Sequence, residues 1–373
     1  MDQLAHADHP DVVGNTPSVP LHNVAPTPKV DEYGLPVGLA VKKQAMGIWE
    51  LLVTGQHLSM ANEEIEQCLA IIAAWRKVFA EGVVRTRIAR EFGAPSAIIR
   101  LDYFWKKECG VQLCEVEERP AGMFATAVIN RKFRGPLMQA LHGVEHAFGK
   151  PLAFCVSGQR ASDSDDHDFV TQYRWGNGPT GGFEPTNCPH IVGLPSEEML
   201  ERYVWWVRSH RTEEEYHPLE EHAVSVISQE GDKSYGVAMG RWFPIDAHWR
   251  HVIPFETGCV LKPRYGSRFE HSLIVHTEAR RLKDDRLPFG VHGWKPAIKA
   301  ITEGRVAYWQ PLYPPESHKF LGDSGYRVLR RAYFSFDFES GRYVPMGGAW
   351  FAHNSMRIHG ADNALAGPLR LPS

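Results

Sequence analysis

The segment Arg100–Gly122, RLDYFWKKECGVQLCEVEERPAG, constrains the fold more than any other part of the chain. Two strand-like stretches flank the polar turn KKECG, a pattern typical of a β-hairpin. Side chains alternate between the faces of a strand, so Arg100 and Asp102 share one face, as do Glu115 and Glu117. If the strands pair across the turn, three carboxylates and one guanidinium group meet at one end of the hairpin.

Composition sets broad limits on the class of protein. The chain has 373 residues, enough for two or three domains, with 43% hydrophobic and 23% charged residues, as in ordinary globular proteins. The formal net charge of −3 does not favour a nucleic-acid partner. No apolar run approaches the about 18 residues of a membrane-spanning helix, and the N-terminus lacks the pattern of a secretory signal. Six cysteines without a CxxC pair indicate reduced thiols, so we expect a cytoplasmic protein with no nucleic-acid or membrane partner.

The first half of the chain divides into an arm and a helical part. Residues 1–36 are rich in proline and lack periodicity, which is typical of a flexible arm. Residues 37–149 contain the hairpin together with apolar residues at three- and four-residue steps, which indicate helices. We expect these helices at 41–55, 61–82, 83–93 and 135–149.

The second half of the chain contains stretches with different sequence patterns. Residues 150–250 begin with a buried strand at 151–158 that follows a helix, which predicts a small α/β lobe. The sequence is then loop-like as far as residue 195, and 196–210 has the acids and serine cap of a helix. Residues 251–373 alternate short apolar strands with Gly and Pro turns, the pattern of a mixed sheet.

A second stretch that carries chemistry is GCVLKPRYGSRFEHSLIVH, residues 258–276. Lys262 ends a buried strand, and Gly266 and Ser267 follow in a turn. A lysine beside exposed backbone N–H groups suits a phosphate, although the Walker pattern GxxxxGK[ST] is absent. Lys233, at an expected helix start in GDKSYGVAMG, is also placed to favour an anion.

The stretch RVAYWQPLYPP reads as a strand that runs into a proline-rich bend. Such a bend offers backbone groups and Tyr313 to a flat heterocycle. Two lysines and a Gly/Ser turn for phosphates, three acids for a divalent metal, and this hinge together predict a site for ATP and Mg²⁺.

Four motifs in this order resemble the circularly permuted ATP-grasp ligases of the glutathionylspermidine synthase type. They are RLDYFW…LCEVEERP, DKSYGVAMG, VLKPRYGSR and YWQPLYPP…GGAWFAHNSMRIHG, the last with a Gly-Gly turn before a strand that ends in Arg357. The resemblance covers roughly residues 85–360. It implies an α/β (α+β) protein with a circularly permuted ATP-grasp fold, whose metal-binding half is at 37–149 and whose nucleotide-binding half is at 251–373. A small α/β pre-ATP-grasp lobe would lie between them at 150–250.

The activity that the resemblance implies is ATP-dependent ligation of a carboxylate and an amine through an acyl phosphate, with release of ADP and phosphate. Arg100 would steady the transferring phosphoryl group, and Mg²⁺ would be held by Asp102, Glu115 and Glu117. The family usually has Glu-x-Asn where this chain has Glu115-Val116-Glu117, so the third acid adds negative charge to the metal site.

The resemblance also implies how ATP and the substrates are held. The expected nucleotide-binding residues are Lys233, Lys262, Gly266, Ser267, Gln310, Leu312 and Tyr313. Candidate clamps for a substrate carboxylate are Arg119, Arg268 and Arg357. The substrates would be a small carboxylic acid and an amine, with a peptide or polyamine attracted by the acidic run SDSDDHDF as one option.

Two other classes of function remain open. The stretch HGVEH, His142–His146, matches the HxxEH pattern of inverted zincins, and Glu220 or Glu221 would supply a third zinc ligand in a metallopeptidase. The simpler interpretation is a helix with two surface histidines. The third possibility is a nucleotide-binding module without catalysis, which the Glu117 departure keeps open.

Overall fold

The structure is a computed structural model, and it describes part of the 373-residue chain. The described residues are 29–30, 36–37, 51–53, 55–81, 86–120, 122–156, 190–208, 217–225, 235–240, 248–249, 258–263, 273–275, 291–292, 294–312, 327–353, 358 and 364–373.

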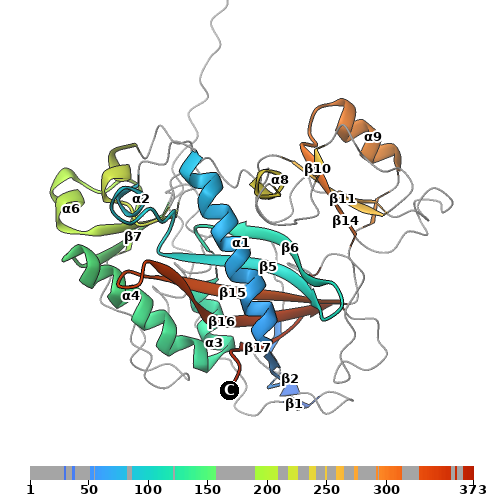
Figure 1. Cartoon of the computed structure of the whole chain (residues 1–373), viewed down its shortest axis with the longest axis horizontal. Coiled ribbons are helices and arrows are strands. Elements are labelled where there is room, and N and C mark those ends of the chain that lie inside the picture. Colours follow the sequence, from blue (N-terminus) through green and yellow to red (C-terminus); the bar gives the residue numbers. More distant parts are fainter. Residues whose placement is uncertain are drawn as a thin grey trace, which may run out of the picture.

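A seven-stranded sheet forms the centre of the described fold, and it joins the first third of the chain to the last (Figure 1). Its order is β3-β17-β16-β15-β5-β6, with β4 also paired to β17. Neighbours are antiparallel, except that β17 runs parallel to β3 and β4. The strands are β3 Leu51–Val53, β4 Leu58–Ser59, β5 Ile98–Lys106, β6 Gly110–Glu117, β15 Arg327–Asp337, β16 Arg342–His353 and β17 Ala364–Arg370.

Helices cover both faces of this sheet. The longest, α1, places its buried residues at helical spacing and packs with them on one face. Tyr103 of β5 reaches α1, whereas Tyr333 of β15 contacts Thr126 and Phe133 on the other face. The helices of this part are α1 Asn62–Glu81, α2 Arg87–Phe92, α3 Met123–Ile129, the 3-10 helix η2 Arg131–Phe133 and α4 Arg134–Phe148.

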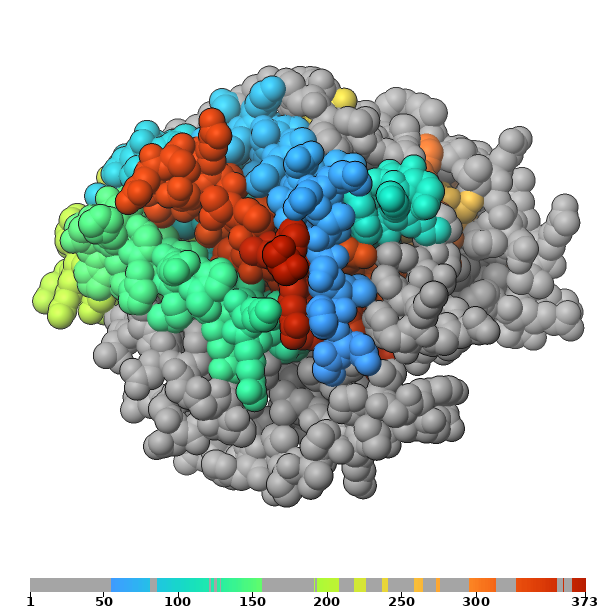
Figure 2. Space-filling view, turned by 60° about the horizontal axis from the view of Figure 1, so that its bottom comes forward, coloured from blue at the N-terminus to red at the C-terminus, as the bar shows by residue number. Residues whose placement is uncertain are grey.

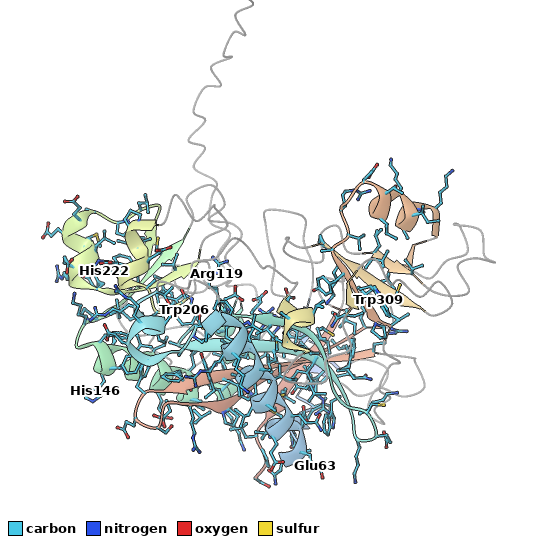
Figure 3. The ribbon with its side chains drawn as sticks, turned by 45° about the horizontal axis from the view of Figure 1, so that its top comes forward. Glu63, Arg119, His146, Trp206, His222 and Trp309 are labelled. Atoms are coloured by element: carbon cyan, nitrogen blue, oxygen red, sulfur yellow. The ribbon has the colours of Figure 1, made fainter. Side chains whose placement is uncertain are left out.

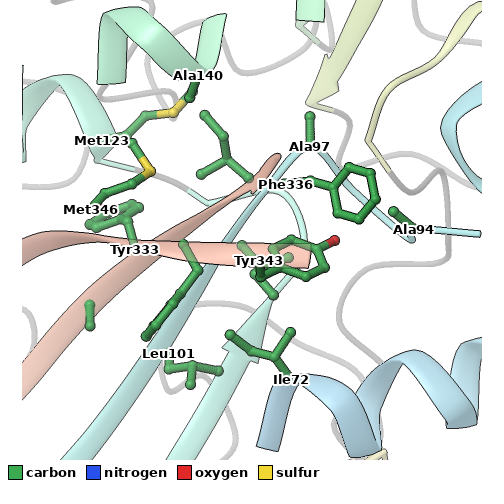
Figure 4. Packing of buried hydrophobic residues seen from close by; sticks show 14 of the residues in the cluster. Ile72, Ala94, Ala97, Leu101, Met123, Ala140, Tyr333, Phe336, Tyr343 and Met346 are labelled. Atoms are coloured by element: carbon green, nitrogen blue, oxygen red, sulfur yellow. The ribbon is translucent and has the colours of Figure 1, made fainter. Parts of the chain in front are cut away.

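The hydrophobic core lies between the sheet and these helices. Figure 4 shows Ile72 of α1, Leu101 of β5 and Tyr333 and Phe336 of β15 in one packed group. Trp75 of α1 is fully buried in the same cluster. At the surface, α1 lies along the C-terminal residues (Figure 2). Burial of these large side chains is the main force that holds the helix on the sheet.

Local capping signals confirm two of the expected helices. Thr86 caps α2, because its side chain accepts a hydrogen bond of 3.4 Å from the backbone N–H of Ala89. Gly93 ends α2 and Gly149 ends α4, each with φ of 60°, the left-handed conformation that favours glycine. The helix expected at 61–82 is also present as α1.

Two expected helices are wrong in part. The helix expected at 41–55 ends in strand β3, Leu51–Val53, and its earlier residues lie outside the described part of the chain. The helix expected at 196–210 ends at Arg202, and Val204–Arg208 then forms strand β9. Residues 204–207 are all buried, so this run is covered on both faces and lacks helical periodicity.

A three-stranded parallel sheet forms a small α/β unit next to α4 and agrees with the expected unit there. Its order is β8-β7-β9, and β8 lies in the stretch that was expected to be loop as far as residue 195. The elements are β7 Leu152–Val156, β8 His190–Val192, α6 Glu197–Arg202, β9 Val204–Arg208 and the 3-10 helix η4 His217–His222.

A five-stranded mixed sheet in the last third of the chain lies at the opposite end of the molecule from the parallel sheet (Figure 1). Its mixed character is as expected, whereas helix α9, which packs on it, was not predicted. The elements are β10 His248–Trp249, β11 Cys259–Lys262, β12 Leu273–Val275, β13 Val291–His292, α9 Trp294–Thr302 and β14 Tyr308–Pro311, in the order β10-β14-β11-β12-β13.

The described fold is therefore of the mixed α+β class. Two small elements complete it: helix α8 Tyr235–Met239 and the strand pair β1 Lys29–Val30 and β2 Pro36–Val37. Of the arm expected at residues 1–36, the described part is limited to residues of this strand pair, so the arm stays a prediction. None of the helices in the described ranges is long and apolar enough to cross a membrane. The expected domain limits and the circular permutation remain predictions.

Candidate functional site

The expected hairpin is present, and its register brings the expected side chains together. Arg100 lies opposite Glu117, and Asp102 lies opposite Glu115. Directly paired residues of antiparallel strands share a face, so all four side chains lie on one face of the hairpin. After Asp102 the register shifts by one residue and leaves Cys114 as the extra residue of a β-bulge in β6.

Asp102 is held between two arginines. Nε and Nη2 of Arg100 lie 2.9 and 3.1 Å from Oδ1 and Oδ2 of Asp102. Arg331 of β15, which lies opposite Asp102 in register, makes the same kind of paired contact at 3.1 and 2.9 Å. Each carboxylate oxygen therefore accepts two charge-assisted hydrogen bonds.

The cluster formed by Arg100, Asp102 and Arg331 is buried. Arg100, Asp102 and Arg331 are exposed by 3%, 4% and 5%. Burial lowers the pKa of Arg100, but Asp102 and Glu117 more than offset it, so the pKa is raised above its ordinary value. Burial and the Arg100 charge lower the pKa of Arg331, and the opposing effect of Asp102 leaves it raised as well. Both guanidinium groups are therefore charged.

Arg100 also connects the buried cluster to the edge of the sheet. Its Nη1 lies 2.8 Å from Oε2 of Glu117, whose side chain is 30% exposed. Glu115, two residues earlier on β6, is half-buried. The arginine expected to act on a phosphoryl group is thus fixed in place by two carboxylates.

The three acids expected to hold Mg²⁺ fit that role unequally. Within the described ranges, no three His, Cys, Asp or Glu side chains gather closely enough to hold a metal ion. The oxygens of Asp102 are turned toward Arg100 and Arg331, so the expected three-carboxylate group is not formed. Glu115 and Glu117 lie nearer the edge, and Glu117 is also paired with Arg100 at 2.8 Å, so their role as ligands of Mg²⁺ remains a prediction.

The five-stranded sheet meets the hairpin at the bulge. The ammonium group of Lys262, at the end of β11, donates to the carbonyl oxygen of Cys114, and Nε2 of Gln310 on β14 donates to the carbonyl oxygen of Leu113 at 3.0 Å. The side chains of Lys262 and Gln310 are both buried. Shortly after Gln310 along the chain, the backbone N–H of Leu312 donates to the carbonyl oxygen of Gly258 at 3.0 Å. Lys262 and Gln310 thus contact the backbone of the acidic hairpin, while their roles toward ATP remain predictions.

Of the remaining expected site residues, Arg119 lies within the described ranges. It is half-buried and follows Glu118, the first residue after β6. The remainder lie outside the described residues: Lys233, Gly266, Ser267, Arg268, Tyr313 and Arg357. Their roles remain predictions.

The expected Gly-Gly turn is wrong, because Gly347 and Gly348 lie inside strand β16. The pairing of β15 with β16 shifts between Tyr333 and Phe334, and Gly347 has φ of 85° at this irregularity. A Cβ atom on Gly348 would come within 1.9 Å of the carbonyl oxygen of Arg331. Because Gly348 has no side chain, the backbone of β16 can approach the carbonyl oxygen of Arg331 closely.

The HxxEH stretch lies on α4, at the end of the molecule away from Trp309 of β14 (Figure 3). His142 and His146 are exposed. Glu145 accepts a hydrogen bond of 3.1 Å from the N–H of Leu152, and its other oxygen lies 3.2 Å from Nδ1 of His142. Glu145 thus connects α4 to the start of β7.

A second buried ion pair lies on the opposite face of β15. Nη1 of Arg330 lies 2.7 Å from Oε2 of Glu64 in α1, and the hydroxyl of Tyr103 donates to Oε1 at 2.6 Å. Sequence reasoning missed both Arg330 and Arg331. The signal was two consecutive arginines in the apolar run VLRRAYFSF, because an arginine inside a buried strand requires an acidic partner.

No protein-family model and no curated protein matches the sequence. Among solved structures, the chain is similar to a glutathione synthetase-like effector from Globodera pallida in its apo form, with 10% sequence identity and a TM-score of 0.43. The alignment covers 89% of this chain and 93% of that chain. A likeness at this level defines neither the fold nor the activity of the present chain.

Proposed function

We propose that this chain is an ATP-dependent carboxylate–amine ligase of the ATP-grasp type. The observation that carries the proposal is the contact of Lys262 and Gln310 with the β6 bulge, next to Glu115. It brings a cation from one sheet to the backbone of the strand that carries Glu115 and Glu117, at the edge of another sheet. Binding of ATP together with Mg²⁺ requires a cation that contacts the phosphates and, beside it, carboxylates that hold the metal ion.

The reaction would proceed in two steps. An oxygen of the substrate carboxylate attacks the γ-phosphorus of ATP, the bond to the bridging oxygen breaks, and ADP leaves. The amine then attacks the acyl carbon, phosphate leaves with the electron pair of the broken C–O bond, and the nitrogen loses a proton. The products are an amide, ADP and phosphate.

The residues near the bulge would divide the binding work. Lys262 would exchange its contact with Cys114 for a phosphate oxygen of ATP, and Gln310 with the backbone of Leu312 would meet the adenine. Glu115 and Glu117 would hold Mg²⁺, which when bound neutralises charge on the transferring phosphoryl group.

Further residues complete the proposed site by resemblance alone. Lys233, Gly266, Ser267 and Tyr313 would add contacts to ATP. Arg119, Arg268 and Arg357 are the candidates for a substrate carboxylate, since guanidinium groups bind carboxylates in a bidentate way. The amine substrate would be small, with a peptide or polyamine as options.

A nucleotide-binding protein without catalysis is a second candidate. One observation favours it: Asp102, expected as a metal ligand, is instead neutralised by Arg100 and Arg331. Such a protein would bind ATP and would not release ADP.

The test is ADP release with Mg²⁺ across a panel of amino acids, small carboxylic acids and amines. We expect turnover that requires one acid and one amine together. Binding of ATP without ADP release for every pair would support the second candidate, and failure to bind ATP at all would contradict both. Stoichiometric zinc in the purified protein would instead support the peptidase interpretation of His142–His146.

A further inference from the structure

We infer that Asp102 is a positioning residue that aligns Arg100 and Arg331, and that it is not a ligand of the metal ion. The inference rests on the proposed function, because it reassigns one acid of the proposed site. It leaves Glu115 and Glu117 as the protein carboxylates that hold the metal.

The hydrogen-bonding capacity of the Asp102 carboxylate is already used by the two arginines. An ionised carboxylate offers about four lone-pair directions. Four N–H···O contacts between 2.9 and 3.1 Å already occupy Asp102, two from Arg100 and two from Arg331. A metal ion could bind Asp102 only if a buried guanidinium group gave up its contacts.

Charge also disfavours a metal ion at Asp102. Two guanidinium groups lie within hydrogen-bonding distance of its oxygens, so the negative charge of Asp102 is already compensated, while Arg100 is shared with Glu117 at 2.8 Å. A divalent cation that approached these oxygens would be repelled by both arginines at short range in a poorly solvated region. The burial of all three residues makes this repulsion stronger than it would be in water.

Asp102 also fixes the direction in which the guanidinium group of Arg100 points. Asp102 binds Nε and Nη2 of Arg100, and the remaining nitrogen, Nη1, lies 2.8 Å from Glu117. Glu117 is on β6, the strand that Lys262 and Gln310 contact from the other sheet. Asp102 therefore positions Arg100, which contacts Glu117 at the edge of the site, and does not itself bind an ion.

The metal affinity of variants tests the assignment. Binding of Mn²⁺ in the presence of the ATP analogue AMP-PNP, followed by electron paramagnetic resonance, would be compared for Asp102→Asn, Glu115→Gln and Glu117→Gln. We expect the Mn²⁺ dissociation constant to rise about tenfold or more for each glutamate variant and to change less than about threefold for Asp102→Asn. An equal loss for Asp102→Asn and Glu115→Gln would overturn the inference.

Glu64→Gln is the matched control. Glu64 is also a buried carboxylate paired with an arginine of β15, but it lies on the opposite face of the sheet. We expect Asp102→Asn to lower kcat with little change in ATP affinity, because Arg100 loses its alignment, and Glu64→Gln to leave kcat unchanged. A fall in kcat of the same size for both variants would reduce Asp102 to a general stabilising role and overturn the inference.

A measurement on the unmodified protein keeps the inference testable if Asp102→Asn does not fold. Arginine side-chain NMR signals, assigned with Arg100→Lys and Arg331→Lys, should show hindered rotation of both guanidinium groups. The hindrance should persist when Mg²⁺ and AMP-PNP are added, whereas capture of Asp102 by the metal would release at least one group and overturn the inference.

The same measurement separates this inference from the proposed function. If the protein binds no AMP-PNP with or without metal, the proposed function fails. Hindered rotation of Arg100 and Arg331 in the free protein would still support the positioning role of Asp102, and free rotation would contradict it.

Discussion

Arg330 and Arg331 are adjacent on β15, yet their guanidinium groups bind carboxylates on opposite faces of the seven-stranded sheet. Arg330 pairs with Glu64 of α1 at 2.7 Å, and Arg331 pairs with Asp102 of β5. Strand geometry requires adjacent side chains to point to opposite faces. A single pair of residues thus connects β15 to the helix on one side and to the neighbouring strand and the candidate site on the other.

Replacement of Arg331 by Ala should destabilise the fold. It removes one partner of a buried ion pair, a change that typically costs about 3–5 kcal/mol, and Arg100 remains to pair with Asp102, so we expect the lower end. Urea denaturation measures the free energy of unfolding. Arg305→Ala, at a pair exposed to solvent, is the control and should cost at most about 1 kcal/mol. Equal small losses for the two variants would contradict the buried clamp.

Replacement of Lys262 by Ala should weaken ATP binding. A charge-assisted contact with a phosphate contributes about 1.5–3 kcal/mol, so we expect the dissociation constant to rise by about ten- to hundredfold. Calorimetry with AMP-PNP measures the affinity. Lys299→Ala, an exposed lysine of α9 in the same lobe, should leave it unchanged. An unaltered affinity in well-folded Lys262→Ala protein would remove the phosphate role.

The two edge carboxylates should differ in their tolerance of substitution. Glu117→Asn should retain substantial Mg²⁺-dependent ADP release, because an amide oxygen still coordinates magnesium. Glu115→Ala should abolish it. ADP release as a function of Mg²⁺ concentration measures both effects, and mild, equal effects would mean that the acids only form a solvated hairpin edge.

Replacement of Gly348 by Ala should destabilise the pairing of β16 with β15 next to Arg331. The added Cβ would lie 1.9 Å from the carbonyl oxygen of Arg331, and overpacking of this kind typically costs about 1–3 kcal/mol. Thermal unfolding of Gly348→Ala measures the loss. Gly135→Ala is the matched control, because its Cβ in α4 would meet nothing within 4 Å, and it should be neutral or stabilising. A Gly348→Ala protein as stable as the control would contradict the close approach.

The stability of the protein should depend on pH through Glu64. Burial raises the pKa of Glu64 above 4.5, and its contacts with Arg330, Tyr103 and the N–H of Ala61 offset only part of this rise. Between 4.5 and the raised value, the folded state holds a proton that the unfolded state has lost, so stability falls as pH rises through this window.

Glu64→Gln lacks this titration and isolates it. The melting temperature of the wild type minus that of Glu64→Gln should decrease as pH rises from 4.5. A difference that grows more favourable over the same range would mean that the ion pair with Arg330 lowers the pKa of Glu64 instead.

Local sequence determined the elements whose contacts lie close along the chain. The apolar spacing of α1, the Thr86 and Gly93 caps of α2 and the pairing of β5 with β6 all follow from neighbouring residues. The convergence of Arg100, Asp102, Glu115 and Glu117 belongs to this group, because a short turn sets the register of a hairpin.

Tertiary structure decided the elements whose surroundings come from distant segments. The run VWWVR, which has the flanking signals of a helix, is a strand because the partner β7 and the cover on both faces come from elsewhere. Leu51–Val53 is a strand because β17, near the C-terminus, pairs with it. Intrinsic propensity is a weak preference that such pairing overrides.

The chemistry of Asp102 shows the same division at the level of one side chain. Its position on a hairpin beside an arginine is a local property of the sequence. Its hydrogen-bond partners are not, because Arg331 lies 229 residues away along the chain and is brought opposite Asp102 by the pairing of β15 with β5. A carboxylate binds whichever cation its surroundings supply, and only the folded chain determines that here this cation is a second guanidinium group.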